Sequence, residues 1–268
     1  MALFNGDEEK VLALDRLVAQ KLGFDQAFTI TGQTYTRKLD TQVLNALAGI
    51  GESAHKFGTD MRLLQNLKEV EEPFESTQVG SSAMPYKRNP MRSERICALS
   101  RFLITAPLHG AFTSAVQWFE RTLDDSANRR LILPQAFLIV DELLGRARRI
   151  IVGMVIREEG LARNLERYGT FAATERVLME LVKAGADRQE MHERIRQHSM
   201  AAWEAVQRDP AGANPLPDLL AADPQMLAHL PAPRIRELLD AGGYVGDAPW
   251  RARELARAIR EACAADER

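Results

Sequence analysis

The chain has 268 residues, of which 46% are hydrophobic and 27% are charged, and its formal net charge is −2. This composition is typical of a soluble globular protein that is long enough for one large domain or two small ones. The near-zero charge excludes a general attraction to nucleic acid or to an anionic membrane, so we expect neither partner. Cys97 and Cys263 have no metal-binding or disulfide spacing, which favours a cytoplasmic protein without a metal site.

The first ten residues contain acidic side chains and no apolar core, so we expect no signal peptide. The first strong helical pattern then extends from Arg37 to Glu71, where apolar residues recur every three or four positions. These residues are Leu39, Val43, Leu47, Ile50, Ala54, Phe57, Met61, Leu64 and Leu67. The pattern predicts one very long amphipathic helix.

A second long helix is predicted from Met91 to Trp118, with a kink at Pro107. Residues 102–119 contain no Asp, Glu, Lys or Arg, but Pro107, His109 and Gln117 interrupt the apolar run. We therefore interpret this stretch as a buried core helix rather than a membrane span.

A third long helix is predicted after Ser126, which we expect to be its N-cap, and it continues through Ile151. Isolated helices gain most of their stability from packing against one another, so three long helices predict a bundle. No strand pattern of any length is present.

Shorter helices are predicted after Gly160, at 170–184, 188–207 and 250–264. Seven of the twelve prolines lie between Pro210 and Pro249, which predicts a connection rich in loops. The expected fold is therefore all-α, with a long-helix bundle at 1–158 and a smaller C-terminal helical domain at 159–268.

A loop is predicted between the first two long helices, from Val79 to Pro90, because Gly80 and two prolines oppose helix formation there. Lys87, Asn89 and the hydroxyl groups of Ser81 and Ser82 could together stabilise an anion. A solvated surface loop explains the same composition equally well, so composition alone leaves both interpretations open.

The residues Gly80-Ser81-Ser82-Ala83-Met84-Pro85-Tyr86-Lys87-Arg88-Asn89-Pro90 resemble the signature of the fumarase/aspartase superfamily. The Tyr86-Lys87-Arg88 variant, followed by Met91-Arg92-Ser93-Glu94-Arg95, is similar to the adenylosuccinate lyases in particular. Two further stretches, Thr29–Lys38 and Trp118–Arg130, also resemble that family, as does Gly185–Ser199. The resemblance implies a carbon–nitrogen lyase that eliminates fumarate from a succinyl-purine nucleotide without a cofactor.

The resemblance also implies roles for particular residues. Ser81 would be the general base, and Lys87 and Asn89 would stabilise the succinyl carboxylate. The substrate-binding residues would be Gln33, Ser82, Arg95, Arg121, Ser126 and Arg130. Arg121, Ser126 and Arg130 would contact the nucleotide phosphate, since helix N-termini and arginine side chains both favour anions. Without the resemblance, ion pairs with Asp124 and Asp125 would explain these arginines, and a turn or N-cap role would explain Gln33.

Family members resemble this chain only from their central domain onward, and the histidines linked to their general acid lie earlier. They act as homotetramers of long helices in which several subunits build each active site. We therefore expect homotetramer formation through the long helices, and little or no lyase activity from this chain alone. Two alternatives stay open: another lyase of the superfamily, such as argininosuccinate lyase or a cycloisomerase, and a non-catalytic helical oligomer or half-enzyme that needs an N-terminal partner.

Overall fold

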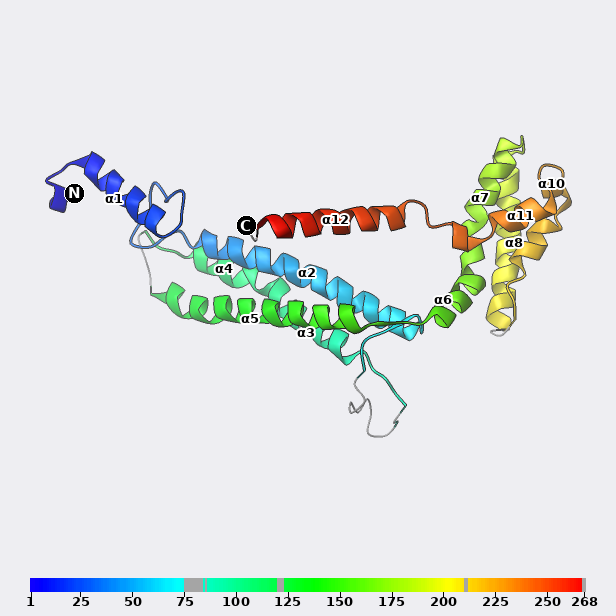
Figure 1. The fold of residues 1–268 in the computed structure, drawn as a ribbon, viewed down its shortest axis with the longest axis horizontal. Helices are drawn as coiled ribbons and strands as arrows, with labels where there is room; N and C mark the ends of the chain where they lie inside the picture. Colours follow the sequence, from blue (N-terminus) through cyan, green and yellow to red (C-terminus); the bar gives the residue numbers. More distant parts are fainter. Residues whose placement is uncertain (75–83, 85, 120–122, 210–211, 267–268) are drawn as a thin grey trace. The chain divides into compact units, whose positions relative to one another are not determined.

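The chain was studied as a computed structural model, which describes residues 1–74, 84, 86–119, 123–209 and 212–266. These residues form two compact units, 1–66 with 70–155 and 67–69 with 156–268 (Figure 1). The predicted all-α fold is confirmed, since the only strands among the described residues are β1 (Val70–Glu71) and β2 (Val155–Ile156). These two strands pair in a two-stranded sheet. The division of the chain into domains at 1–158 and 159–268 stays a prediction.

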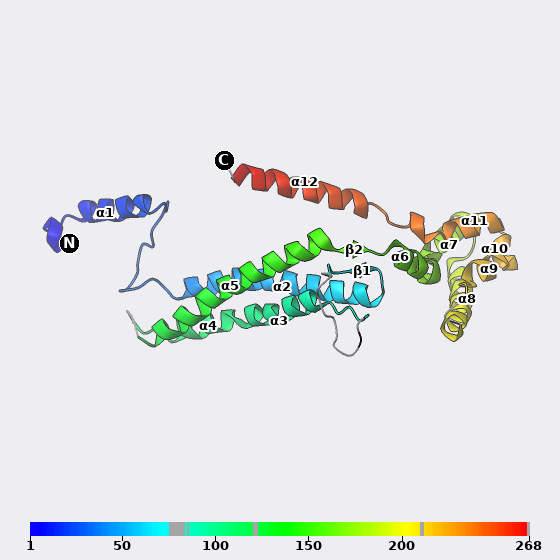
Figure 2. The same cartoon turned by 60° about the horizontal axis from the view of Figure 1, so that its bottom comes forward.

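The first unit contains a bundle of helices that lie side by side (Figures 1 and 2). After η1 (Ala2–Phe4) and α1 (Glu8–Lys21), the bundle is formed by α2 (Lys38–Asn66), α3 (Met91–Thr105), α4 (Pro107–Ala115) and α5 (Asp124–Gly153). The start of α3 packs near the end of α2, whereas the start of α5 packs near the start of α2. Helix α3 is therefore antiparallel to α2, and α5 is parallel to it.

The three predicted long helices are present, but the first ends at Asn66 rather than Glu71, and the other two differ from the prediction as follows. The predicted kink at Pro107 is confirmed as a break, because α3 ends at Thr105 and Pro107 is the first residue of α4. Proline tolerates this first position, where its missing N–H group has no helical partner to lose. The N-cap prediction for Ser126 is wrong: α5 begins at Asp124, and Leu123 occupies the cap position without a side-chain hydrogen bond.

The core of the bundle consists of apolar side chains from α2, α3 and α5 that are almost fully buried. They include Leu44, Ile96, Leu103, Ala136, Leu143 and Ile150. Two glycines on one face of α2 let α3 approach closely. A Cβ atom at Gly51 would lie 2.9 Å from the Leu103 Cβ, and one at Gly58 would lie 2.9 Å from the Cys97 Sγ. The spacing of seven residues keeps both glycines on the seam with α3.

The segment Met91–Ala115, which contains α3 and α4, is long and apolar enough by composition to cross a membrane. A core helix of a soluble bundle passes the same test of length and composition. Ile96, Leu103 and Ala106 on this segment are at most 1% exposed, and they belong to the core shared with α2 and α5. Only 33% of the most apolar window of this segment is buried, so its interpretation as a core helix stays a prediction.

The second unit is built from shorter helices around its own apolar core. Its elements are α6 (Glu158–Asn164), a π-helical turn η2 (Leu165–Gly169), α7 (Thr170–Lys183), α8 (Arg188–Arg208), α9 (Leu216–Ala221), α10 (Pro224–Leu227), α11 (Ala232–Leu238), η3 (Ala241–Gly243) and α12 (Ala248–Asp266). The predicted helices at 170–184, 188–207 and 250–264 are confirmed within two residues. Between α7 and α8, Gly185 adopts a φ of 92°, which glycine tolerates without strain.

The prediction of a loop-rich connection between Pro210 and Pro249 is wrong in part, because α9, α10 and α11 lie within it. Each of these helices has a proline at its first or second position. In the first turn a proline removes no helical hydrogen bond and its fixed φ suits the helix, so it starts a helix instead of preventing one.

Candidate active site

The described part of the predicted loop lies at the end of α2 and the start of α3. Lys87 is exposed and Asn89 is half-buried. Among the described residues Lys87 forms no ion pair, and its backbone N–H group donates to the Met84 carbonyl at 2.9 Å. Its ammonium group is therefore available to an anion. Ser81 and Ser82 lie outside the described residues.

Apart from Arg95, the other described residues that were predicted to bind the substrate lie at the opposite end of α2, and of these Ser126 and Arg130 were predicted to contact the phosphate. Gln33 is exposed and precedes α2 by five residues, while Ser126 is half-buried and Arg130 exposed in the first two turns of α5. Arg121 lies outside the described residues. Ser126 and Arg130 are four residues apart and so share one face of α5, where a hydroxyl group and a guanidinium group can meet the same anion.

A network of buried charges joins the starts of α2 and α5, and sequence reasoning did not find it. Arg37 Nε donates to the Asp125 carboxylate, and the two side chains are only 6% and 2% exposed. Arg129 donates to Asp40 and to the hydroxyl group of Tyr35. Tyr35 in turn donates to Asp40 at 2.7 Å. Burial, together with the hydrogen bond to Asp40, raises the pKa of Tyr35 above its usual value.

This network accounts for one of the two acids, Asp125, that could have paired with the predicted phosphate-binding arginines. Asp125 pairs with Arg37, which directly precedes α2, and Arg129 pairs with Asp40. Within the described part of the chain, Arg130 forms no ion pair. Asp125 and Arg129 thus fix one face of α5 against α2, while Ser126 and Arg130 lie on the neighbouring, more exposed face.

The two groups of predicted site residues are far apart within one chain. Helix α2 has 29 residues, so at 1.5 Å per residue its ends are about 40 Å apart. Lys87 and Asn89 lie at its C-terminal end, and Gln33, Ser126 and Arg130 lie at its N-terminal end. Arg95 is exposed in the second turn of α3 and belongs with Lys87, not with Arg130. The structure therefore brings the predicted residues into two sites.

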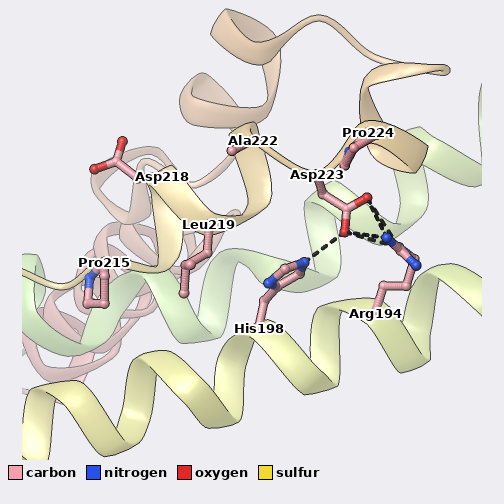
Figure 3. A pocket seen from close by; sticks show the side chains of 8 residues that line it. All are labelled: Arg194, His198, Pro215, Asp218, Leu219, Ala222, Asp223 and Pro224. Atoms are coloured by element: carbon pink, nitrogen blue, oxygen red, sulfur yellow. Dashed lines mark hydrogen bonds and ion pairs between the residues drawn. The ribbon is translucent and has the colours of Figure 1, made fainter.

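The second unit has a separate pocket, lined by both charged and apolar residues, which sequence reasoning did not identify (Figure 3). Asp223, which is 3% exposed, accepts hydrogen bonds from Arg194 Nε at 3.0 Å and pairs with His198 Nε2 at 2.7 Å. Burial alone would raise the pKa of Asp223, but the bonds from Arg194 and His198 outweigh it and lower the pKa to about 2. The carboxylate also caps α10 through the N–H groups of Gln225 and Met226. These contacts connect α8 to α10 and give the cluster a structural role.

No group of three or more His, Cys, Asp or Glu side chains in the described ranges lies close enough together to hold a metal ion.

Two family models match the chain. Residues 6–102 match the family described as Lyase, and residues 170–255 match the family described as Adenylosuccinate lyase C-terminus. The chain is 48% identical over 252 residues to the adenylosuccinate lyase of Schizosaccharomyces pombe, covering 93% of this chain and 51% of that protein. The adenylosuccinate lyase of Saccharomyces cerevisiae is 47% identical over 249 residues, with the same coverage. The chain thus spans about half the length of the curated relatives it matches.

Solved structures show the same fold. The 3-carboxy-cis,cis-muconate lactonizing enzyme from Pseudomonas putida has a TM-score of 0.74 at 25% identity, covering 94% of this chain and 54% of that one. A fumarate lyase from Mesorhizobium sp. BNC1 has a TM-score of 0.71 at 22% identity, covering 88% of this chain and 50% of that one. The fold, the loop ending in Lys87-Arg88-Asn89 and the high identity to two yeast enzymes agree with one another. The chain belongs to the adenylosuccinate lyase family of the fumarase/aspartase superfamily.

Proposed function

We propose that this chain forms the central and C-terminal part of an adenylosuccinate lyase. The enzyme would eliminate fumarate from adenylosuccinate to give AMP, and from the related succinyl-carboxamide ribotide, in purine nucleotide biosynthesis. The main support is the 48% identity to the fission yeast adenylosuccinate lyase over nearly the whole chain. We also propose a cytoplasmic location, in line with the cysteine usage.

In this proposal Ser81 removes the proton beside the succinyl carboxylate, which creates a second negative charge on that group. Lys87 and Asn89 stabilise the charge, because a cation and an amide donor act most strongly where charge develops. An acid outside this chain then protonates the leaving nitrogen as fumarate departs. The ammonium group of Lys87, exposed and without an ion pair in the described ranges, agrees with this role.

The nucleotide phosphate would bind at the start of α5. Ser126 and Arg130 lie on one face there, close to the N–H groups of the first helical turn, and Arg121 would complete the phosphate pocket, whereas Gln33 would contact the succinyl group. The buried pairs of Asp125 and Arg129 hold this end of α5 against α2.

The distance of about 40 Å along α2 requires more than one copy of the chain for one complete active site. We propose a homotetramer in which Lys87 of one copy meets Ser126 and Arg130 of another. Large apolar side chains on the bundle support this assembly. Phe112, Leu131 and Leu138 are 72%, 63% and 70% exposed, and a surface of this kind favours association.

The first test measures adenylosuccinate cleavage by ultraviolet absorbance. The purified chain would be assayed alone and after mixing with the N-terminal half of the fission yeast enzyme. We expect cleavage only in the mixture, since the proposed acid lies in the added half. Robust fumarate release by the chain alone would contradict the need for that half, and a folded mixture without activity would contradict the proposed function.

A second test addresses the shared site. Lys87→Ala and Arg130→Ala variants would each retain only a small residual activity with the added half, but a mixture of the two should recover activity. Random mixing of copies leaves about a quarter of the shared sites with both residues intact. A mixture that stays at the residual activity, although size measurements show mixed oligomers, would mean that both residues act within one copy.

The alternatives make different predictions. Another lyase of the superfamily would cleave argininosuccinate, or isomerise a muconate, in preference to succinyl-purine nucleotides. A non-catalytic oligomer would bind none of these substrates. A substrate panel with the complemented chain separates the three, and the identity to the yeast enzymes favours the purine substrates.

A further inference from the structure

Gln65 in the last turn of α2 contacts both ends of the segment between β1 and α3, which contains Lys87. It is 7% exposed, and both ends of its amide group form hydrogen bonds. Its Nε2 donates to the Arg88 carbonyl at 3.0 Å, and its Oε1 accepts from the Glu72 backbone N–H group at 3.2 Å. Gln65 thus connects Glu72, at the start of this segment, to Arg88, near its end.

Glu72 makes the second connection across the loop. Its carboxylate, 4% exposed, accepts from the Arg92 N–H group at 2.9 Å and from both the N–H and hydroxyl groups of Ser93 at 3.0 Å. These N–H groups belong to the first turn of α3, where the cap residue Pro90 offers no side-chain bond. A carboxylate at a helix N-terminus also interacts favourably with the helix dipole. Glu72 therefore caps α3 from a position twenty residues earlier in the sequence.

Arg88 is fixed between the two proposed catalytic residues. Its guanidinium group lies 3.4 Å from Glu71 and 5.2 Å from the centre of the Phe74 ring. With its carbonyl bound to Gln65, both its backbone and its side chain have partners. The neighbouring Lys87 and Asn89 are held by the same backbone, and the Met91 N–H group donates to the Asn89 carbonyl at 2.8 Å.

From these contacts we infer that Gln65 and Glu72 are positioning residues, which fix the backbone of Lys87 and Asn89 relative to α2 and α3. The inference rests on the proposed function of Lys87 and Asn89. A buried carboxylate and a buried amide are costly to desolvate unless every polar atom is paired. A local Ser or Asp would cap α3 at lower cost, but Glu72 is also bound through its own N–H group to Gln65, which holds the Arg88 carbonyl. The contacts of Gln65 and Glu72 therefore stabilise both the backbone at Arg88 and the start of α3.

The first readout needs no activity. Amide hydrogen exchange would be measured on the purified chain for Gln65→Met, which keeps the volume but loses both bonds, and for Gln42→Met as control. Gln42 is an exposed residue of the same helix. We expect exchange at Lys87 and Met91 to become at least about tenfold faster in Gln65→Met only, because their hydrogen bonds to the Met84 and Asn89 carbonyls open more often once the Arg88 backbone is no longer held. Unchanged exchange at both amides would overturn the inference.

The second readout uses the chain mixed with the N-terminal half of the fission yeast enzyme. We expect Gln65→Met to lower kcat by about 10- to 100-fold, the range for a slight misplacement of a catalytic group. Inhibition by AMP should stay unchanged, because the phosphate residues lie at the other end of α2. In a Lys87→Ala background, Gln65→Met should lower kcat by less than about a further twofold. Additive losses would show a purely structural role and overturn the inference.

Glu72→Gln is the second variant. It keeps the shape of the side chain but presents an NH₂ group to donors of α3, so Arg92 and Ser93 should exchange faster as well. If Gln65→Met does not fold, the same two readouts on Glu72→Gln decide the inference. If the unsubstituted mixture has no lyase activity, the proposed function fails, and hydrogen exchange alone decides whether Gln65 and Glu72 fix the loop.

Discussion

Gly58, in the middle of α2, lies so close to α3 that a methyl group has no room. A Cβ atom there would be 2.9 Å from the Cys97 Sγ, 3.0 Å from the Ser93 carbonyl oxygen and 3.3 Å from the Ile96 Cγ2. The Ser93 backbone cannot retreat easily, because its N–H and hydroxyl groups are bound to Glu72. Gly58→Ala should therefore push the first turns of α3 away from α2.

The expected size of this effect follows from two opposing terms. In the interior of a helix, Gly→Ala by itself stabilises by roughly 1 kcal/mol. A Cβ atom at Gly49 on the same helix would have no atom within 4 Å, so Gly49→Ala should show this gain alone. At Gly58 the overpacking costs roughly 1–3 kcal/mol. The free energy of unfolding should thus be about 1–3 kcal/mol lower for Gly58→Ala than for Gly49→Ala.

Urea unfolding of the purified chain, followed by circular dichroism, measures this difference. Both variants remove the same glycine flexibility from the same helix, so their comparison isolates the packing term. Equal midpoints and slopes would refute the close approach of α2 and α3 at Gly58. Gly58→Ala should also speed amide exchange at Ser93, since that residue must move with α3.

Other substitutions test the buried charges of each unit. Asp223→Asn should lower the stability of the second unit by about 3–5 kcal/mol in thermal unfolding, because Arg194 and His198 lose their carboxylate; a change below about 0.5 kcal/mol would contradict this. The pKa of Asp223 falls from 3.8 to about 2 on folding, so its contribution is fully present above roughly pH 4 and is lost as the pH falls toward 2. That contribution is about 2 kcal/mol. Asp223→Asn should therefore lose about 2 kcal/mol less stability on acidification than the unsubstituted chain. Arg37→Ala should lower the free energy of unfolding by about 3–5 kcal/mol, because it leaves Asp125 buried without its partner. The double variant Arg37→Ala/Asp125→Ala should lose less stability than the two single variants together. Additive losses in urea unfolding would show that the pair does not interact.

The long helices were predictable because each has an apolar stripe with the period of a helix, as from Arg37 to Glu71. Helix α1 and the helices α9 to α11 were missed for different reasons. Helix α1 has no buried residue, so its sequence gives no sign of packing against another element. Asp7 nevertheless caps it by accepting from the Lys10 N–H group. The helices α9 to α11 were hidden by their prolines, which were interpreted as breakers although they stand in first turns. The position of a proline within a helix decides its effect, and sequence alone does not show that position.

The predicted site depended on resemblance more than on pattern. Lys87 and Asn89 were predicted because the signature around them is specific, but no periodicity could show that Arg37 would pair with Asp125, 88 residues later. Charged residues at helix starts are usually solvated, so a buried pair of this kind leaves no local signal. Gln65 and Glu72 were missed for the same reason, since their partners are backbone groups of a distant segment.

The length of helix α2 sets the distance between the two groups of proposed site residues. It packs on α3 through the glycine seam and on α5 through the Arg37–Asp125 pair, so its two ends are held rigidly apart. Local motions of a loop cover a few ångströms and cannot close a gap of about 40 Å. If Lys87 and Arg130 act on one substrate, they must come from different copies, and the exposed apolar faces of α4 and α5 are then part of the catalytic apparatus. A charge introduced there, at Leu138 for example, should abolish activity without touching any residue that binds the substrate, because it prevents the assembly in which the site exists.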